Sequence, residues 1–179
     1  MANSVLWRRN DIPGHEYSQL EQRESSWLLS GVAIFEFERL ACRLDYAIAC
    51  DRSWHTKSAS VSGRVGDRAI DSRTEADASG AWMLNGVPCP EVRGCLDVDL
   101  NFSPSTNLLP IRRLGLAIGQ SAAVRAAWLR FPGFTLEPLD QTYTRTGERT
   151  YRYESSTGFA AEIVVNESGL PVSYGDIWS

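Results

Sequence analysis

The fold class follows from the stretch Gly94-Cys95-Leu96-Asp97-Val98-Asp99-Leu100-Asn101-Phe102, in which apolar and polar residues alternate. Successive side chains of a β-strand point to opposite faces, so this alternation predicts a strand over residues 94–102. One face would carry leucine, valine and phenylalanine, and the other would carry aspartate and asparagine. We therefore expect the first face to be dry and the second to be polar.

Strand-like runs continue on both sides of this stretch and are separated by clusters of Gly, Pro, Asn, Asp and Ser. Residues 40–50 alternate in the same way. Residues 122–131 are rich in alanine, but the glycine and proline on either side favour a strand over a helix. The apolar residues at 32–37 break the alternation, and we expect a bend or bulge there. Three turn clusters after residue 140 predict a meander whose successive strands pair.

One short helix is predicted at residues 107–115. Ser105, Thr106 or Asn107 can cap its start, and Pro110 is tolerated only in a first turn. A helix of this length is marginal in isolation, so it has to pack against or inside the curved sheet. The sequence therefore predicts one mostly β domain over residues 1–179, with a single short α-helix.

The composition argues against several classes of protein. The chain has 179 residues, a net charge of −4 and one lysine, Lys57, so it lacks the basic excess that nucleic-acid binding requires. Its apolar runs are too interrupted for a signal peptide or a transmembrane segment, and we expect a cytoplasmic protein. The spacing of Cys42, Cys50, Cys89 and Cys95 fits no zinc signature. We expect reduced, buried thiols, no metal and no cofactor.

Asp97 and Asp99 would leave the predicted strand on the same face, about 7 Å apart. Inverting glycosidases hold two carboxyl groups about 6.5–9.5 Å apart, but on opposite sides of the sugar. The sequence also lacks the common nucleophile and phosphate-loop motifs. We assign no catalytic residue, and keep as an alternative an enzyme that acts on a glycoconjugate through these aspartates with Arg112 and Arg113.

Arg112 and Arg113 lie on the predicted helix and allow two interpretations. A guanidinium enclosed by the sheet needs a partner, so one arginine could pair with Asp97 or Asp99 and lock the helix in place. Alternatively, one arginine could face a pocket and hold a phosphate, a carboxylate or a sugar hydroxyl.

Tyr143, Arg145, Tyr151 and Tyr153 cluster in the last predicted hairpins. Aromatic rings with polar tips suit a sugar ring, which needs stacking and hydroxyl partners together. The same pattern also describes an exposed antiparallel sheet with cross-strand tyrosine pairs. Trp54, next to His55, is a smaller candidate for ligand contact.

The block from Gly94 to Ser155, which begins GCLDVDLNFSPSTNLLPIRRLGLAIGQ, resembles the putative glycolipid-binding family, formerly a domain of unknown function. Similarity extends to Trp7-Arg8, to Gly14-His15-Glu16, to the segment from Cys50 to Trp54 and to Asp176-Ile177-Trp178. The resemblance implies a spiral β-roll, in which a many-stranded antiparallel sheet wraps around one short central α-helix. It also implies glycolipid binding without catalytic residues, and dimers among relatives.

The expected function is non-catalytic binding of a glycolipid or another amphipathic small molecule, in a cavity or in the groove of a homodimer. The candidate ligand-binding residues are Trp54, Asp97, Asp99, Arg112, Arg113, Tyr143, Arg145, Tyr151 and Tyr153. A further alternative is a protein-interaction module in which exposed aromatic residues, such as Trp178, build a partner surface. Trp178 could instead anchor the chain end in the core.

Overall fold

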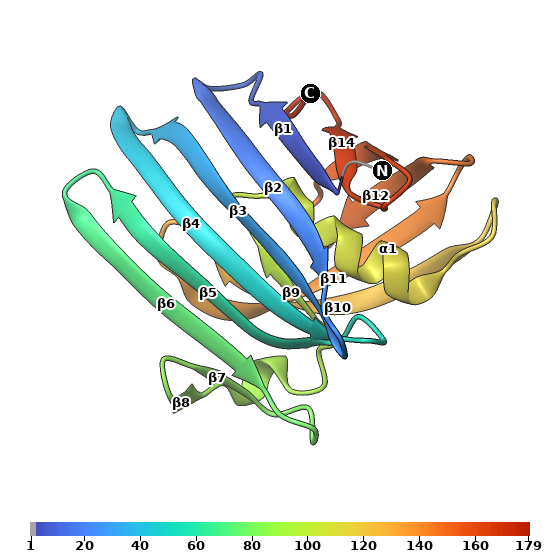
Figure 1. The fold of residues 1–179 in the computed structure, drawn as a ribbon, viewed down its shortest axis with the longest axis horizontal. Coiled ribbons are helices and arrows are strands. Elements are labelled where there is room, and N and C mark those ends of the chain that lie inside the picture. Colours follow the sequence, from blue (N-terminus) through green and yellow to red (C-terminus); the bar gives the residue numbers. More distant parts are fainter. Residues whose placement is uncertain (1–2) are drawn as a thin grey trace.

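Two curled β-sheets make up most of the computed structural model, which describes residues 3–179 (Figure 1). The first sheet holds eight strands in sequence order: β1 (Ser4–Arg8), β2 (Gly14–Gln22), β3 (Ser26–Phe37), β4 (Leu40–Asp51), β5 (Thr56–Val65), β6 (Arg68–Ala76), β7 (Trp82–Leu84) and β8 (Val87–Pro88). The second holds six, in the order β14 (Pro171–Tyr174), β13 (Ala160–Val165), β12 (Thr150–Ser155), β11 (Thr135–Arg145), β10 (Ser121–Arg130) and β9 (Asp97–Leu100). Neighbouring strands are antiparallel, except that β9 runs parallel to β10.

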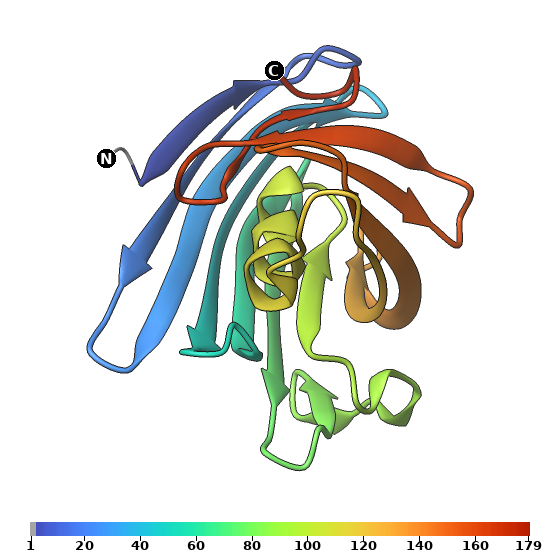
Figure 2. The ribbon, with the colours of Figure 1, turned by 90° about the vertical axis from the view of Figure 1, so that its right-hand side faces the viewer.

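A single α-helix, α1 (Leu108–Leu114), lies between the two sheets (Figure 2). It follows a 3-10 turn, η2 (Pro104–Asn107), and a second such turn, η1 (Pro90–Val92), lies between β8 and β9. Leu108, Leu109 and Ile111 are buried, so the helix is held by packing, as its length requires. The predicted helix at residues 107–115 is confirmed.

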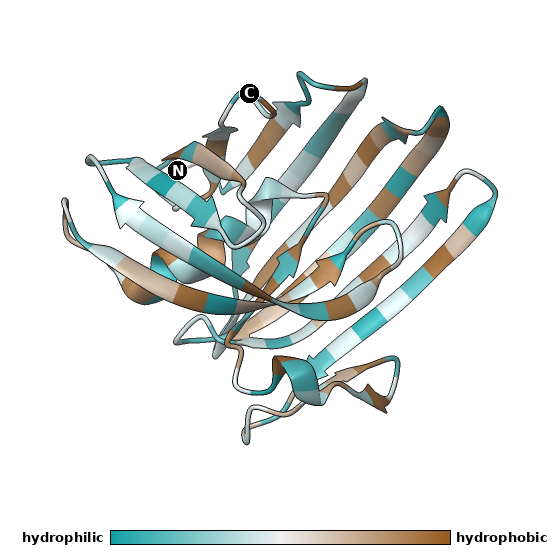
Figure 3. Cartoon of the chain, turned by 180° about the vertical axis from the view of Figure 1, so that it is seen from behind, coloured by the Kyte–Doolittle hydropathy of each residue, from teal (hydrophilic) through white to brown (hydrophobic). Residues whose placement is uncertain are grey.

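The mostly β architecture around one short helix is confirmed, and its curled sheets are consistent with a β-roll-like fold. Apolar and polar bands alternate along several strands (Figure 3), and the apolar faces turn inward. The main core draws residues from both sheets and from the helix, including Leu44, Ile48, Leu100, Leu108 and Leu129. This cluster holds the two sheets and the helix together, and a second, smaller cluster packs Ile111 of the helix against Tyr143, Tyr153 and Ile163 of the second sheet.

The alternation in residues 94–102 predicts a strand correctly, but β9 is shorter than expected and its faces differ from the prediction. Asp97 is 1% exposed, whereas Leu96 is 40% exposed. The alternation predicts Leu96 on the dry face together with Val98, but Leu96 precedes the strand and is exposed, whereas Val98 is buried. Of the two aspartates of β9, Asp97 contacts Arg113 of α1, and Asp99 contacts Gln141 of β11. A strand in a parallel pair is commonly covered on both faces.

Of the bend or bulge predicted at residues 32–37, the bulge is wrong. β3 pairs with β4 without a register shift from Ser26 to Phe37. The alternation is lost because Ile34 is 56% exposed on the outer face while Phe35 packs in the core. The other expected elements are confirmed, since residues 122–131 overlap β10 and the strands β10 to β14 form the meander.

Trp178 joins the two sheets at one corner of the molecule. Its backbone forms isolated bridges to Arg9, just after β1, and to Tyr174 of β14. The indole is 3% exposed and packs edge-on against Trp7, at 6.4 Å between ring centroids. Trp178 therefore anchors the end of the chain in the interior.

All four cysteines are free and buried. Within residues 3–179, no group of three or more His, Cys, Asp and Glu side chains is arranged to hold a metal ion. The only α-helix in that range is too short to span a membrane.

Candidate functional site

A cavity of about 310 Å³ opens between the strands of the second sheet and the C-terminal segment. Its volume is at the lower end of the range for small-molecule sites. Charged, polar and aromatic side chains line it, among them Arg9, Asp99, Asn107, Trp128, Tyr153, Phe159, Tyr174 and Trp178. The cavity thus combines aromatic rings with hydrogen-bonding groups.

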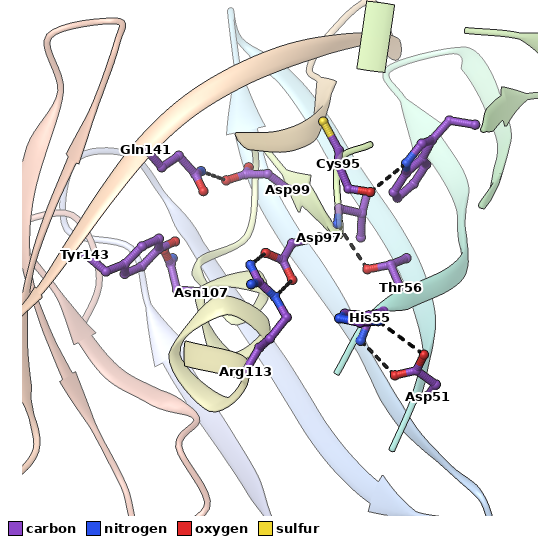
Figure 4. A network of polar contacts seen from close by, with 12 residues as sticks. Asp51, His55, Thr56, Cys95, Asp97, Asp99, Asn107, Arg113, Gln141 and Tyr143 are labelled. Carbon is purple, nitrogen blue, oxygen red and sulfur yellow. Dashed lines mark hydrogen bonds and ion pairs between the residues drawn. The ribbon is translucent and has the colours of Figure 1, made fainter. Parts of the chain in front are cut away.

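Asp99 is the one carboxyl group among the lining residues of this cavity. It accepts a hydrogen bond from Gln141 Nε2 at 2.7 Å (Figure 4). The same nitrogen also donates to Tyr153 Oη at 3.0 Å. Burial raises the pKa of Asp99 to about 6, although the hydrogen bond from Gln141 opposes this shift. Asp99 is therefore mostly an ionised acceptor at neutral pH, held in place by an amide.

Asp97 is not among the lining residues of this cavity and pairs instead with Arg113 of the helix (Figure 4). Arg113 Nε donates to Asp97 Oδ1 at 3.2 Å, and Nη2 donates to Oδ2. Burial raises the pKa of Asp97, and the guanidinium acts in the opposite direction. Of the two interpretations of these residues, the structure contains the ion pair between helix and sheet.

Tyr143 fixes the other end of the helical segment. Its hydroxyl donates to Asn107 Oδ1 at 2.7 Å, while Asn107 Nδ2 donates to the Pro104 carbonyl at 2.9 Å. Tyr143 and Tyr153 are cross-strand partners on β11 and β12, with ring centroids 5.2 Å apart. The predicted tyrosine pair therefore exists, but its exposure on an open sheet face is wrong, because both rings are buried in the interior.

Arg112, Arg145 and Tyr151 line a different hollow, a cleft of about 390 Å³ beside the C-terminal end of α1. Trp54 lies in neither lining; its ring stacks on Trp27 at 4.5 Å between centroids, and the Arg112 guanidinium lies over it. The neighbouring His55 pairs with Asp51 at 3.5 Å (Figure 4).

The predicted site residues therefore fall into three groups. Asp99 and Tyr153 line the cavity between the sheet and the C-terminal segment. Arg112, Arg145 and Tyr151 line the cleft beside the helix. The remaining residues join structural elements or pack in the core: Asp97, Arg113, Tyr143 and Trp54.

Sequence reasoning missed several residues of the cavity, notably Arg9, Trp128, Tyr174 and Trp178. Arg9 holds Asp11 through two hydrogen bonds and places its Cζ 5.0 Å from the centroid of the Trp178 ring. The two residues are separated by almost the whole chain, and no local pattern brings them together. The one signal in the sequence that could have indicated this contact is the presence of aromatic residues near both ends of the chain, Trp7 at the start and Tyr174 and Trp178 at the end.

Sequence reasoning also missed Glu16, an acid that lies behind the cavity wall and contacts the cavity residue Ser103. It accepts hydrogen bonds from Tyr46 Oη at 2.6 Å and from the hydroxyl of Ser103, a cavity residue. Its other oxygen, Oε2, is buried and has no hydrogen-bond partner within residues 3–179. Burial raises the pKa of Glu16 to about 8, so the carboxyl group is protonated at neutral pH.

Comparison with known proteins assigns the chain to a family. The family model described as "Putative glycolipid-binding" matches residues 4–179. The crystal structure of a DUF1089 family protein from Pseudomonas aeruginosa aligns with a TM-score of 0.79 and 32% sequence identity, over 90% of this chain and 90% of that chain. No curated protein matches the sequence. The chain belongs to the putative glycolipid-binding family.

Proposed function

We propose that the protein binds the sugar head of a glycolipid, or of a similar amphipathic molecule, in the cavity beside Asp99 and Tyr153. The observation that carries the proposal is the combination of a fixed hydrogen-bond acceptor with aromatic rings. Gln141 holds Asp99 next to Tyr153, and Trp128 and Tyr174 line the same space. Sugars are bound by aromatic faces together with polar groups that pair with their hydroxyls.

The size of the cavity supports binding of the head alone. At about 310 Å³ it is at the lower limit for small-molecule pockets, so an acyl chain would extend beyond it. The name of the family also favours a glycolipid over an unrelated metabolite.

Binding without catalysis is supported by the number of carboxyl groups that reach the cavity. Double-displacement and inverting glycosidases both need a pair of carboxyl groups at the sugar. Asp97 is engaged by Arg113, which leaves Asp99 as the one acid in the lining. This lining favours binding over a glycosidase that would use Asp97 and Asp99 together. The cytoplasmic location and the homodimer stay predictions.

The proposal is tested by titrating the full chain with monomeric octyl glucoside and with a panel of soluble glycolipids. Tryptophan fluorescence follows binding, because Trp128 and Trp178 line the cavity. We expect Asp99→Asn to weaken binding about tenfold, the effect of losing one charge-assisted hydrogen bond. Asp140→Asn is the matched control, because Asp140 is exposed and pairs with Arg125 away from the cavity.

Two results would contradict the proposal. One is the absence of saturable binding by every member of the panel, checked by native mass spectrometry. The other is an equal effect of Asp99→Asn and Asp140→Asn, which would assign the change to net charge.

A further inference from the structure

The cleft beside the C-terminal end of α1 differs in character from the proposed sugar site. Three arginines line it, Arg112, Arg145 and Arg149, together with the acids Glu148 and Glu167. Three guanidiniums and two carboxylates give the lining a formal charge of +1, in a chain whose net charge is −4. The cleft thus concentrates positive charge on an acidic protein.

Arg145 is held rigidly but is not neutralised. Its guanidinium donates to three backbone carbonyls, those of Leu116 at 2.8 Å, Gly147 at 3.1 Å and Glu148 at 2.6 Å. Carbonyl oxygens fix the orientation of the side chain without cancelling its charge. Three of the five N–H groups of an arginine are thereby used, and two are left for a ligand.

Arg112 forms no ion pair or side-chain hydrogen bond with any residue in the range 3–179, and its guanidinium is exposed. Its Cζ lies 5.2 Å from the centroid of the Trp54 ring, which holds the charge without neutralising it. The aliphatic part of the side chain packs against the turn at Gly169, where an added Cβ would lie 2.8 Å from Arg112 Cδ. The stem of Arg112 is therefore held in place while its charged end stays free.

Most other arginines of the chain do have a carboxylate partner. Along the strands the partner often lies two residues away, as in Arg43 with Asp45 and Arg152 with Glu154. Arg149 of the cleft pairs with Glu167 at 2.9 Å, but both side chains are half exposed, so this pair can exchange for a ligand at little cost. The cleft therefore brings two guanidiniums without a carboxylate partner among residues 3–179 into one hollow.

We propose that this cleft binds a phosphate group, with Arg112 and Arg145 as its main contacts. Guanidinium groups bind phosphate oxygens through pairs of N–H donors, and their charge persists at all physiological pH values. The proposal does not depend on the sugar site, because the two hollows have no lining residue in common. The phosphate could belong to a soluble ester or to the head of a phospholipid.

The competing explanation is structural. Arginines in the last turn of a helix interact favourably with its C-terminal carbonyls, and Arg145 could serve only to clamp two loops. A purely structural role predicts that Arg112→Gln changes stability slightly and that phosphate does not bind.

The experiment is a calorimetric titration of the full chain with inorganic phosphate and with glycerol 3-phosphate at low ionic strength. We expect saturable binding with a Kd of about 1 mM, typical of a small anion on an exposed site. Arg112→Gln, at an exposed position, should weaken it about tenfold. The matched control is Arg152→Gln, because Arg152 is on β12, in the same sheet as Arg145, but does not line the cleft. This variant should bind phosphate like the wild type.

The source of the phosphate is distinguished with vesicles of phosphatidylcholine, with and without phosphatidic acid. Cosedimentation with the phosphatidic acid vesicles that is lost in Arg112→Gln supports a phospholipid head. Binding of glycerol 3-phosphate without binding to vesicles supports a soluble ester. The proposal is overturned if the wild type binds neither phosphate probe, or if Arg112→Gln and Arg152→Gln weaken binding equally. Asp99→Asn should leave phosphate binding unchanged, so this proposal can fail while the sugar site stands.

Discussion

Arg113 of α1 and Asp97 of β9 form a two-pronged ion pair in which the carboxylate is more deeply buried than the guanidinium. The side chain of Asp97 is 2% exposed and that of Arg113 is 16% exposed. Together with the Tyr143–Asn107 hydrogen bond, this pair ties the helical segment to the second sheet at both ends. These two contacts fix both the rotation of the helix about its axis and its position along the second sheet.

The unequal burial predicts unequal effects of removing the two partners. Arg113→Met leaves a buried carboxylate without a partner and should lower the free energy of unfolding by about 3 kcal/mol. Asp97→Asn leaves an arginine that still reaches solvent and an amide oxygen that still accepts, so about 1–2 kcal/mol is expected. Urea denaturation measures both values.

The double variant supplies the control for that comparison. If the two side chains interact directly, Asp97→Asn in the Arg113→Met background should cost less than it does alone. Strictly additive effects would show that the contact contributes nothing of its own.

The buried carboxyl of Glu16 predicts that the protein loses stability as the pH rises. Its pKa is about 8 in the folded state and about 4.5 when unfolded, so the folded state holds an extra proton between these values. The stabilisation is complete below about pH 4.5 and is lost as the pH rises through about 8. One extra proton gives a slope of about −1.4 kcal/mol per pH unit within that window.

Glu16→Gln tests this directly, because glutamine resembles the protonated acid in shape and charge. Its Tm should match that of the wild type at about pH 4.5, and its advantage over the wild type should grow up to about pH 8 and stay constant above that value. Asp99 also has a raised pKa, to about 6, but it titrates in both proteins, so its contribution cancels in the difference between them. Glu148→Gln, at an exposed position, controls for the loss of one charge. Parallel Tm curves for wild type and Glu16→Gln would mean that Glu16 is ionised in the folded protein.

The pKa of Asp99 predicts how sugar binding should respond to pH. With a pKa of about 6, its carboxylate accepts hydrogen bonds from sugar hydroxyls at pH 7 and is mostly protonated at pH 5. Affinity for octyl glucoside should therefore fall about tenfold between pH 7 and pH 5. Asp99→Asn should remove this dependence, and an equally steep fall in that variant would exclude Asp99 as its cause.

Local patterns predicted the secondary structure well, because period-two alternation and turn residues act over a few positions. The alternation around Val98 and the cluster near Leu108 correctly predicted β9 and α1. The division into two sheets and the parallel pairing of β9 with β10 depend on contacts between distant segments. No local pattern contains that information.

The same limit applies to the candidate sites. Asp97 and Asp99 were recognised as neighbours on one face of a strand, yet one is bound by Arg113 and the other lines the cavity. The strand twists, and each carboxylate meets a different element. Arg9 and Trp178 join the cavity only because the two ends of the chain pair with each other. The sequence therefore predicts which side chains could bind a ligand, but not which of them lie together in the folded chain.

The position of Trp178 predicts a role in stability rather than in association. Its indole is buried against Trp7 and lies under the guanidinium of Arg9, and its backbone bridges both sheets. Trp178→Ala should lower the free energy of unfolding by about 3–5 kcal/mol, as expected for a large aromatic residue removed from a core. Sedimentation velocity should give the same oligomeric state for Trp178→Ala and wild type at a temperature where both are folded. Leu6→Ala is the matched control, because Leu6 is 70% exposed on β1 and should change stability little. A folded Trp178→Ala that dissociates from a larger assembly would instead assign this tryptophan to a partner surface.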